Sequence, residues 1–225
     1  MDALNLHQPN LYINRELSLL EFNRRVLAQS LDTDTPLLER LKFLCIASNN
    51  LDEFFEIRVA GLKQQVVYGS MQRGPENLSP ADQLKRISVA AHGLVGEHYD
   101  VLNNALLPAL RDEGIRFLAR GEWTRSQTTW VKRFFSRELL PLLSPLGLDP
   151  SHPFPRILNK SLNFLVSLKG KDAFGRNSGV AVVQAPRSLP RVIAVPPQHT
   201  DGENDFVLLS SIIHAHVDDL FPGMH

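Results

Sequence analysis

The sequence predicts an α+β fold in which an N-terminal all-helical bundle is followed by a mixed α/β head domain. Up to about residue 140, apolar side chains recur with the 3.6-residue period of helices. Five prolines then fall within residues 141–155, a density that no helix interior tolerates. Short strand-like runs come after them. We therefore assign residues 1–114 to the helical domain and residues 115–225 to the head domain.

The first two helices are expected from capping signals and apolar spacing. Asn14 is a candidate N-cap for the first helix. Thr35 followed by Pro36 predicts the start of the second. A polar run at residues 48–53, Ser-Asn-Asn-Leu-Asp-Glu, is of a kind that seldom lies inside a helix, so we expect a break there. The predicted apolar stripe of the first helix is Leu19, Phe22 and Val26, with Leu20 and Leu27 beside it. The predicted stripes on either side of the polar run are Leu37, Leu41 and Leu44, and then Phe55, Val59, Leu62 and Val66.

Two further helices complete the helical part of the prediction. Ser79 and Pro80 form a cap and first-position proline for a helix that runs to about Asp112, where Gly114 marks its end. Thr124 and Gln127 form a capping box for the next helix, which is expected to end near residue 140.

The head domain is predicted to contain short strands. Their expected positions are residues 162–168, 179–184, 191–195 and 206–208, with an amphipathic segment after the last. So few short strands without a closing element predict an incomplete domain, and we expect the chain to continue into further structure.

Composition excludes several classes of protein. The chain has 43% hydrophobic and 21% charged residues, with 24 basic and 24 acidic side chains, which is ordinary globular composition. A zero net charge argues against nucleic acid as a partner. The single cysteine, Cys45, excludes a disulfide framework, and its apolar surroundings predict a buried structural thiol. With no secretory signal and no apolar run of about 20 residues, we expect a cytoplasmic location.

General motifs predict neither a catalytic residue nor a metal site in this chain. Glycine-rich phosphate loops and zinc-binding helix signatures are absent from the sequence. His214 and His216 lie two residues apart, which on a helix turns them by ~200° from each other, so we interpret them as incidental surface histidines. His152, held between rigid residues, is interpreted as a structural turn histidine.

Asn50 has two interpretations, and both stay open at this level. It could cap the helix that follows, with Glu53 as its capping-box partner. Alternatively its amide, with an acceptor beside two donors, could bind an adenine edge.

Several segments together resemble one known family. Residues 11–27 begin Leu-Tyr-Ile-Asn-Arg-Glu-Leu-Ser, and residues 48–58 contain Ser-Asn-Asn-Leu-Asp-Glu-Phe-Phe. Residues 143–163 and residues 218–223 match further along, in the same order. The sequence is thus similar to bacterial polyphosphate kinases, which make long-chain polyphosphate from ATP. Leu19 stands where many members carry tryptophan, and both side chains are apolar.

The resemblance implies the activity of the whole enzyme and a limited role for this part. Such kinases reversibly move the terminal phosphate of ATP to polyphosphate through a phosphohistidine. That histidine, the Mg²⁺ site and most phosphate contacts lie in two C-terminal domains with a phospholipase-D-like fold, outside this chain. The carried-over ligand is Asn50, which matches the family's ATP-binding asparagine. The resemblance also implies ATP or ADP and inorganic polyphosphate as partners, a homotetramer joined through head domains, and no activity for this part alone.

An alternative from another class is a stand-alone, non-catalytic module that senses nucleotides or acts as a scaffold. A gene that continues past Met224 would favour the kinase. The family resemblance also leaves open peripheral attachment to the inner membrane.

Overall fold

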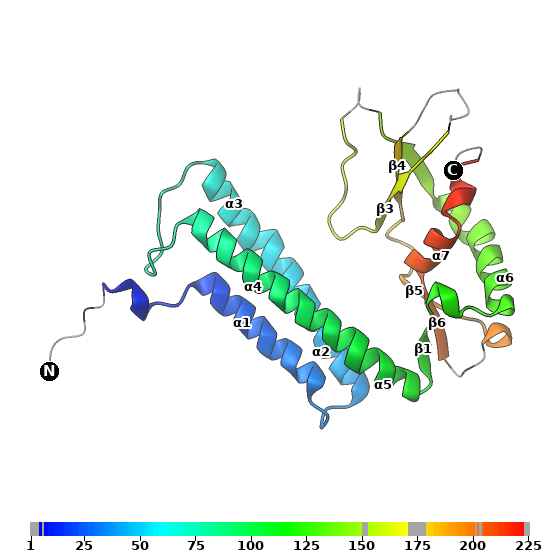
Figure 1. Ribbon diagram of the computed structural model, residues 1–225, viewed down its shortest axis with the longest axis horizontal. Helices are drawn as coiled ribbons and strands as arrows, with labels where there is room; N and C mark the ends of the chain where they lie inside the picture. Colours follow the sequence, from blue (N-terminus) through cyan, green and yellow to red (C-terminus); the bar gives the residue numbers. More distant parts are fainter. Residues whose placement is uncertain are drawn as a thin grey trace. The chain divides into compact units, whose positions relative to one another are not determined.

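The computed structural model describes residues 5, 7–149, 153–170, 179–200, 202 and 204–222. The chain divides into two compact units, Met1–Asp112 and Glu113–His225 (Figure 1). The first is helical and the second combines small sheets with helices, which confirms the predicted α+β fold class.

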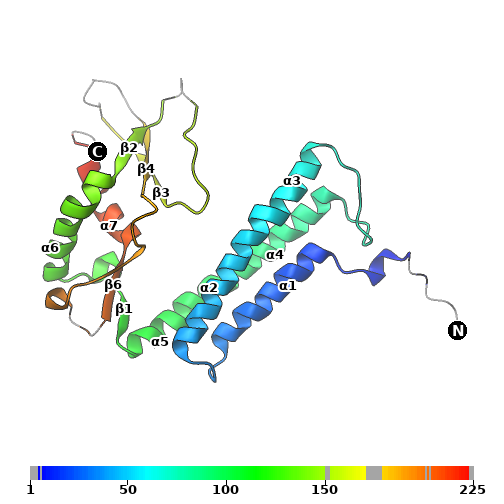
Figure 2. The same cartoon turned by 180° about the vertical axis from the view of Figure 1, so that it is seen from behind.

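Long helices packed side by side make up the first unit (Figures 1 and 2). Its α-helices are α1 (Arg15–Ala28), α2 (Leu37–Glu53), α3 (Ala60–Val67), α4 (Pro80–Val101) and α5 (Leu107–Asp112). Turns of π-helix at Phe54–Val59 and Leu102–Leu106 join α2 to α3 and α4 to α5 without a break. The bundle therefore consists of α1 and two longer continuous rods.

The core of this unit lies where α1, the α2–α3 rod and the α4–α5 rod meet. Its buried residues are Leu20, Leu27, Leu44, Ala47, Phe54, Val59, Leu62, Ile87, Ala91, Leu94, Val101 and Leu106. Burial of this apolar surface is the main favourable contribution to the stability of the bundle.

The predicted apolar stripe of α1 is wrong by one position. The buried face carries Leu20, Asn23 and Leu27, whereas Leu19 and Phe22 are 37% and 50% exposed. Two neighbouring stripes on one helix both have helical spacing, and the packing partners decide between them. Leu19 and Phe22, which are only partly covered by the bundle, are therefore able to line a pocket.

The predicted break at residues 48–53 is also wrong, because α2 runs through it into the π-helical turn. Polar side chains disfavour helix interiors when they bond to their own backbone. Asn50 instead donates a hydrogen bond to Asn23 on α1, so the helix is not interrupted. Phe54 follows Leu44 and Ala47 on the buried face of α2 and is 7% exposed, whereas the predicted core residue Phe55 is 42% exposed.

Three predicted N-caps are confirmed. Asn14 accepts from the backbone N–H groups of Glu16 and Leu17, and Thr124 forms a reciprocal capping box at the start of the helix that follows it. Ser79 accepts from the backbone N–H of Asp82. The Ser79 hydroxyl also donates to the Asp82 side chain, which lowers the pKa of that carboxyl.

Two local predictions in and before α2 are wrong. The cap of α2 is Pro36 and not Thr35, because Thr35 lies in the preceding turn, where its hydroxyl bonds to Asp32. Cys45 is exposed because its neighbour Leu44 occupies the buried face of α2.

Two three-stranded sheets form the framework of the second unit (Figure 1). The strands are β1 (Ile115–Phe117), β2 (Ser144–Gly147), β3 (Asn163–Ser167), β4 (Val180–Gln184), β5 (Val192–Ala194) and β6 (Asn204–Leu208). In the order β1-β6-β5, β1 is parallel and β5 antiparallel to β6; in the order β2-β4-β3 both neighbours are antiparallel to β4.

Strands β3 to β6 confirm the predicted ones, and β1 and β2 were not predicted. Strand β2 contains Pro145 and lies at the edge of its sheet, where a missing N–H is tolerated. Strand β1 spans only three residues and pairs with β6, about 90 residues further along the chain. Gly114, just before β1, has a φ of 77°, consistent with the predicted end of the preceding helix.

Helices α6 (Arg125–Phe134) and α7 (Leu209–Ala215) share an apolar core with these sheets. A π-helical turn at Phe135–Leu139 extends α6. The buried residues of this unit are Leu118, Val131, Phe135, Leu139, Leu143, Val183, Ala185, Ile193, Val195, Val207, Leu209, Ile212, Ile213 and Leu220. In the described part of the chain, no helix has the combined length and apolar character needed to cross a membrane.

Replacing Asn14 with alanine should lower the free energy of unfolding by about 1–2 kcal/mol, because two helix N–H groups lose their cap. The substitution also removes two hydrogen bonds that the Asn14 amide donates to the side chains of Glu76 and Gln83, at 2.7 and 3.0 Å. Urea unfolding measures the change. Asn104→Ala, at an exposed helical position, is the control and should stay within about 0.5 kcal/mol of wild type. Equal effects of the two substitutions would contradict the capping role.

Candidate functional site

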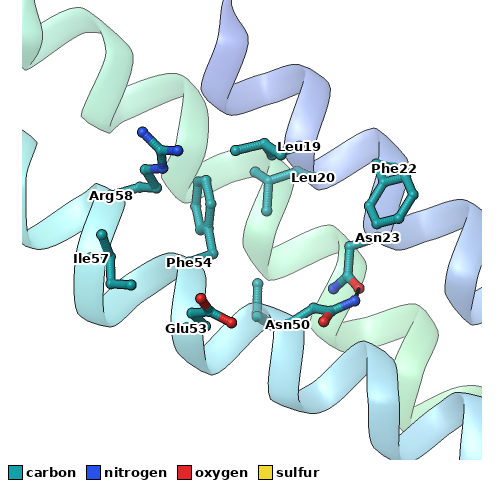
Figure 3. Close-up of a pocket in the computed structure, with 10 residues that line it drawn as sticks. Leu19, Leu20, Phe22, Asn23, Asn50, Glu53, Phe54, Ile57 and Arg58 are labelled. Carbon is teal, nitrogen blue, oxygen red and sulfur yellow. Dashed lines mark hydrogen bonds between the residues drawn. The ribbon is translucent and has the colours of Figure 1, made fainter.

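A pocket of about 270 Å³ opens on the helical unit between α1 and the junction of α2 with the π-helical turn (Figure 3). It is lined by Leu19, Leu20, Phe22, Asn23, Asn50, Leu51, Glu53, Phe54, Ile57 and Arg58. Apolar walls with a few polar groups are typical of small-molecule sites, and the volume lies just below the ~300 Å³ at which typical ligand pockets begin. The space suits one planar heterocycle.

Asn50 lies inside α2, in its last turn, and is partly buried. Its Nδ2 donates to Oδ1 of Asn23 at 3.2 Å. The N-cap interpretation is therefore wrong, since α2 begins at Leu37 and continues past Asn50. Within the described residues no hydrogen bond is seen to Asn50 Oδ1, which leaves one acceptor and one N–H of this amide able to bind a ligand.

Asn23 is the polar partner that sequence reasoning missed. Only 5% of it is exposed, and its Nδ2 donates to the backbone carbonyl of Ala47 at 2.8 Å. The available signal was its place in the stripe with Leu20 and Leu27: an asparagine on an apolar helix face must find a partner across the interface.

The walls of the pocket come from both sides. Phe54, Ile57 and Arg58 follow Asn50 by four, seven and eight residues, which is the spacing of one helix face. Phe54 packs edge-on against Phe55, with ring centroids 5.8 Å apart. Phe22 on α1 is half exposed. Flat aromatic and aliphatic surfaces of this kind stack well on a planar ring.

Two charged side chains also line the pocket, Arg58 from the π-helical turn and Glu53 from the end of α2 (Figure 3). Arg58 is 37% exposed in its side chain, and its Nε lies 4.0 Å from Oε2 of Glu16. Glu53, the last residue of α2, is exposed. A guanidinium here can contact an anionic part of a ligand whose apolar part fills the pocket.

His214 and His216, the histidines that lie two residues apart in the sequence, do not form a metal-binding cluster within the described part of the chain. His216 bonds to Asp219 at 3.1 Å and its ring stacks on Phe135, while His214 is exposed. In the described ranges no three His, Cys, Asp or Glu side chains come together as metal ligands. His152 lies outside the described residues.

The chain matches two family models, "Polyphosphate kinase N-terminal domain" over residues 12–118 and "Polyphosphate kinase middle domain" over residues 126–225. Polyphosphate kinase of Pseudomonas syringae pv. tomato is 56% identical over 99% of this chain and 30% of its own length. That of Pseudomonas aeruginosa is 57% identical over 96% of the chain and 31% of its own.

A crystal structure of polyphosphate kinase from Porphyromonas gingivalis superposes with a TM-score of 0.80 at 31% identity, covering 95% of this chain and 31% of that one. The present chain thus spans about 30% of the length of the relatives it matches.

Replacing Asn23 with alanine should lower the free energy of unfolding by about 1–3 kcal/mol, since one buried and one partly buried hydrogen bond disappear. Asn50→Ala should lower it by less than about 1 kcal/mol, because its former partner Oδ1 of Asn23 is the only bonded atom it releases. Urea unfolding of both variants provides the comparison. If Asn50→Ala lowered the free energy of unfolding more than Asn23→Ala does, Asn23 would not be the main polar contact between α1 and α2.

Proposed function

Because the chain belongs to the polyphosphate kinase family, we propose that it is the N-terminal and middle portion of an ATP–polyphosphate phosphotransferase. In this proposal its helical unit binds the base of ATP or ADP. The complete enzyme moves the terminal phosphate of ATP reversibly to polyphosphate through a phosphohistidine outside this chain. In this proposal Mg²⁺ and most phosphate contacts also belong to those other domains.

One observation carries this proposal: the Asn50 amide lines an apolar pocket, and its Oδ1 and one of its N–H groups have no hydrogen-bond partner among the described residues. Adenine presents an amino donor next to a ring-nitrogen acceptor, and an asparagine amide complements that pair with its own acceptor and donor. Leu19, Phe22 and Phe54 supply the apolar surfaces for the two faces of the ring.

Arg58 gives the pocket a direction. Base binding at Asn50 points the ribose and phosphates either toward Arg58 or toward open solvent, and the guanidinium favours the first. Phosphoryl transfer depends on positioning and on neutralising charge. In this proposal the helical unit anchors the base, while the reacting phosphates are held elsewhere.

The second unit is proposed to contribute to self-association of the enzyme, with a homotetramer as the expected assembly. Leu146 on β2 and Leu165 on β3 are 49% and 70% exposed, and Phe154 is 65% exposed. Leu146 and Leu165 both pair with Val182 of β4 and so lie on one face of the sheet, and exposed apolar side chains on a sheet are a feature of contact surfaces. We also propose a cytoplasmic location.

Asn50→Ala should abolish nucleotide-induced changes at the pocket, because both hydrogen bonds to the base are lost. ATP and ADP are titrated into isotope-labelled chain, and the backbone amide spectrum is followed. In the wild type we expect shifts centred on residues 48–58, with a dissociation constant on the order of millimolar, about −4 kcal/mol, since a single base contact desolvates few groups.

The matched control is Asn49→Ala, because Asn49 is the neighbouring asparagine, is exposed and does not line the pocket. It should bind as the wild type does. Shifts that persist unchanged in Asn50→Ala, or that vanish equally in Asn49→Ala, would contradict base binding by Asn50.

The purified chain should form no polyphosphate from ATP and Mg²⁺, because the residues proposed to accept and transfer the phosphate lie in other domains. A coupled assay for ADP release together with gel analysis of polyphosphate measures this. Sustained synthesis by the 225-residue chain would refute the proposed division of labour.

A further inference from the structure

We propose that Asn23 is a positioning residue that locks the amide of Asn50 in one orientation, so that the pocket prefers adenine to guanine nucleotides. This inference rests on the proposed base binding at Asn50. Asn23 lies on α1 and also lines the pocket, and its hydrogen bond to Asn50 is the contact through which it would set the orientation of that amide.

A chain of hydrogen bonds leaves each amide one orientation. The carbonyl of Ala47 can only accept, so Asn23 must turn its Nδ2 toward it, at 2.8 Å. The Asn23 Oδ1 then faces Asn50 and can only accept, so Asn50 must turn its own Nδ2 inward, at 3.2 Å. Figure 3 shows the two amides facing each other across the gap between α1 and α2.

Burial makes this lock effective. Asn23 is 5% exposed and Ala47 2% exposed, so water has little access to replace either partner. Turning the Asn50 amide by 180° would place its oxygen against the Asn23 oxygen and leave two acceptors facing each other without a proton. The orientation is thereby set by α1 and does not depend on the ligand.

The orientation decides which base fits. Rotation of an asparagine amide about its last torsion exchanges donor and acceptor, and in a free side chain that torsion is broad. With Nδ2 held toward Asn23, the Asn50 oxygen is the group left to accept the amino group of adenine. Guanine carries a carbonyl oxygen at the same ring position, so two acceptors would meet. On the Watson–Crick edge of the base, an unlocked amide could turn, so that its N–H donates to the guanine carbonyl and its oxygen accepts from the adjacent ring N–H.

The test compares ADP with GDP by amide-shift titration of isotope-labelled wild type, Asn23→Leu and Asn14→Ala chains. Leucine fills nearly the same space but can neither donate nor accept. We expect wild type to bind ADP about tenfold more tightly than GDP, and Asn23→Leu to narrow that preference to within about threefold. Asn14→Ala, a substitution of another buried asparagine at the start of α1, should keep the wild-type preference.

A second measurement needs no nucleotide. Nitrogen relaxation of the Asn50 side-chain amide should report a rigid group in the wild type and a mobile one in Asn23→Leu. A mobile Asn50 amide in the wild type would overturn the lock even if Asn23→Leu fails to fold. An unchanged preference for ADP in folded Asn23→Leu would overturn the role in specificity.

Failure of the underlying base site has a different signature. If the wild type binds neither nucleotide, or if Asn50→Ala binds both as well as wild type does, the proposed function fails and the specificity role fails with it. The relaxation measurement would still decide whether Asn23 holds the Asn50 side chain.

Discussion

The helical unit depends on a requirement that buried amides must be satisfied. Asn23 sits on the apolar face of α1, and its hydrogen bonds to Ala47 and Asn50 both cross to α2. An unpaired amide at that depth would cost about 1–3 kcal/mol, so slippage of α1 against α2 by even one turn is disfavoured. The two bonds therefore help to fix the register of α1 on α2, and with it the positions of Leu19 and Phe22 beside the pocket.

The same requirement explains why a polar run lies in the middle of a helical rod. Residues 48–53 remain helical because Asn50 finds its partner on another helix. The π-helical turn that follows adds a residue to the winding. Phe54 lies in the core at the start of this turn, and Ile57 and Arg58 within the turn line the pocket. Such π turns occur frequently at functional sites, since they redirect side chains without breaking the helix.

Features decided by a few neighbouring residues could be predicted from the sequence. Asn14, Ser79 and Thr124 cap helices through atoms only two or three residues away. Features decided by distant partners could not. The buried stripe of α1 depends on which helices pack against it, and the exposure of Cys45 follows from the rotation of α2. Strand β1 exists only because β6 lies beside it. Asn50 was singled out from its amide chemistry and a family resemblance, but Asn23 became visible only when α1 and α2 were placed together.

The proposed nucleobase site, made of amides and apolar walls, is consistent with the proposed kinase, whose chemistry is assigned to other domains. Titratable groups are needed where protons or charges move, and there the environment must shift their pKa. A site that binds the nucleobase has no need of titratable groups. It needs an orientation that stays fixed while the phosphates react. Amides do not ionise, so a change of pH leaves the Ala47–Asn23–Asn50 chain of hydrogen bonds intact. In the proposed site, the rigidity of a buried helix interface would pass directly to the ligand, which is one way that binding energy far from the reacting atoms contributes to catalysis.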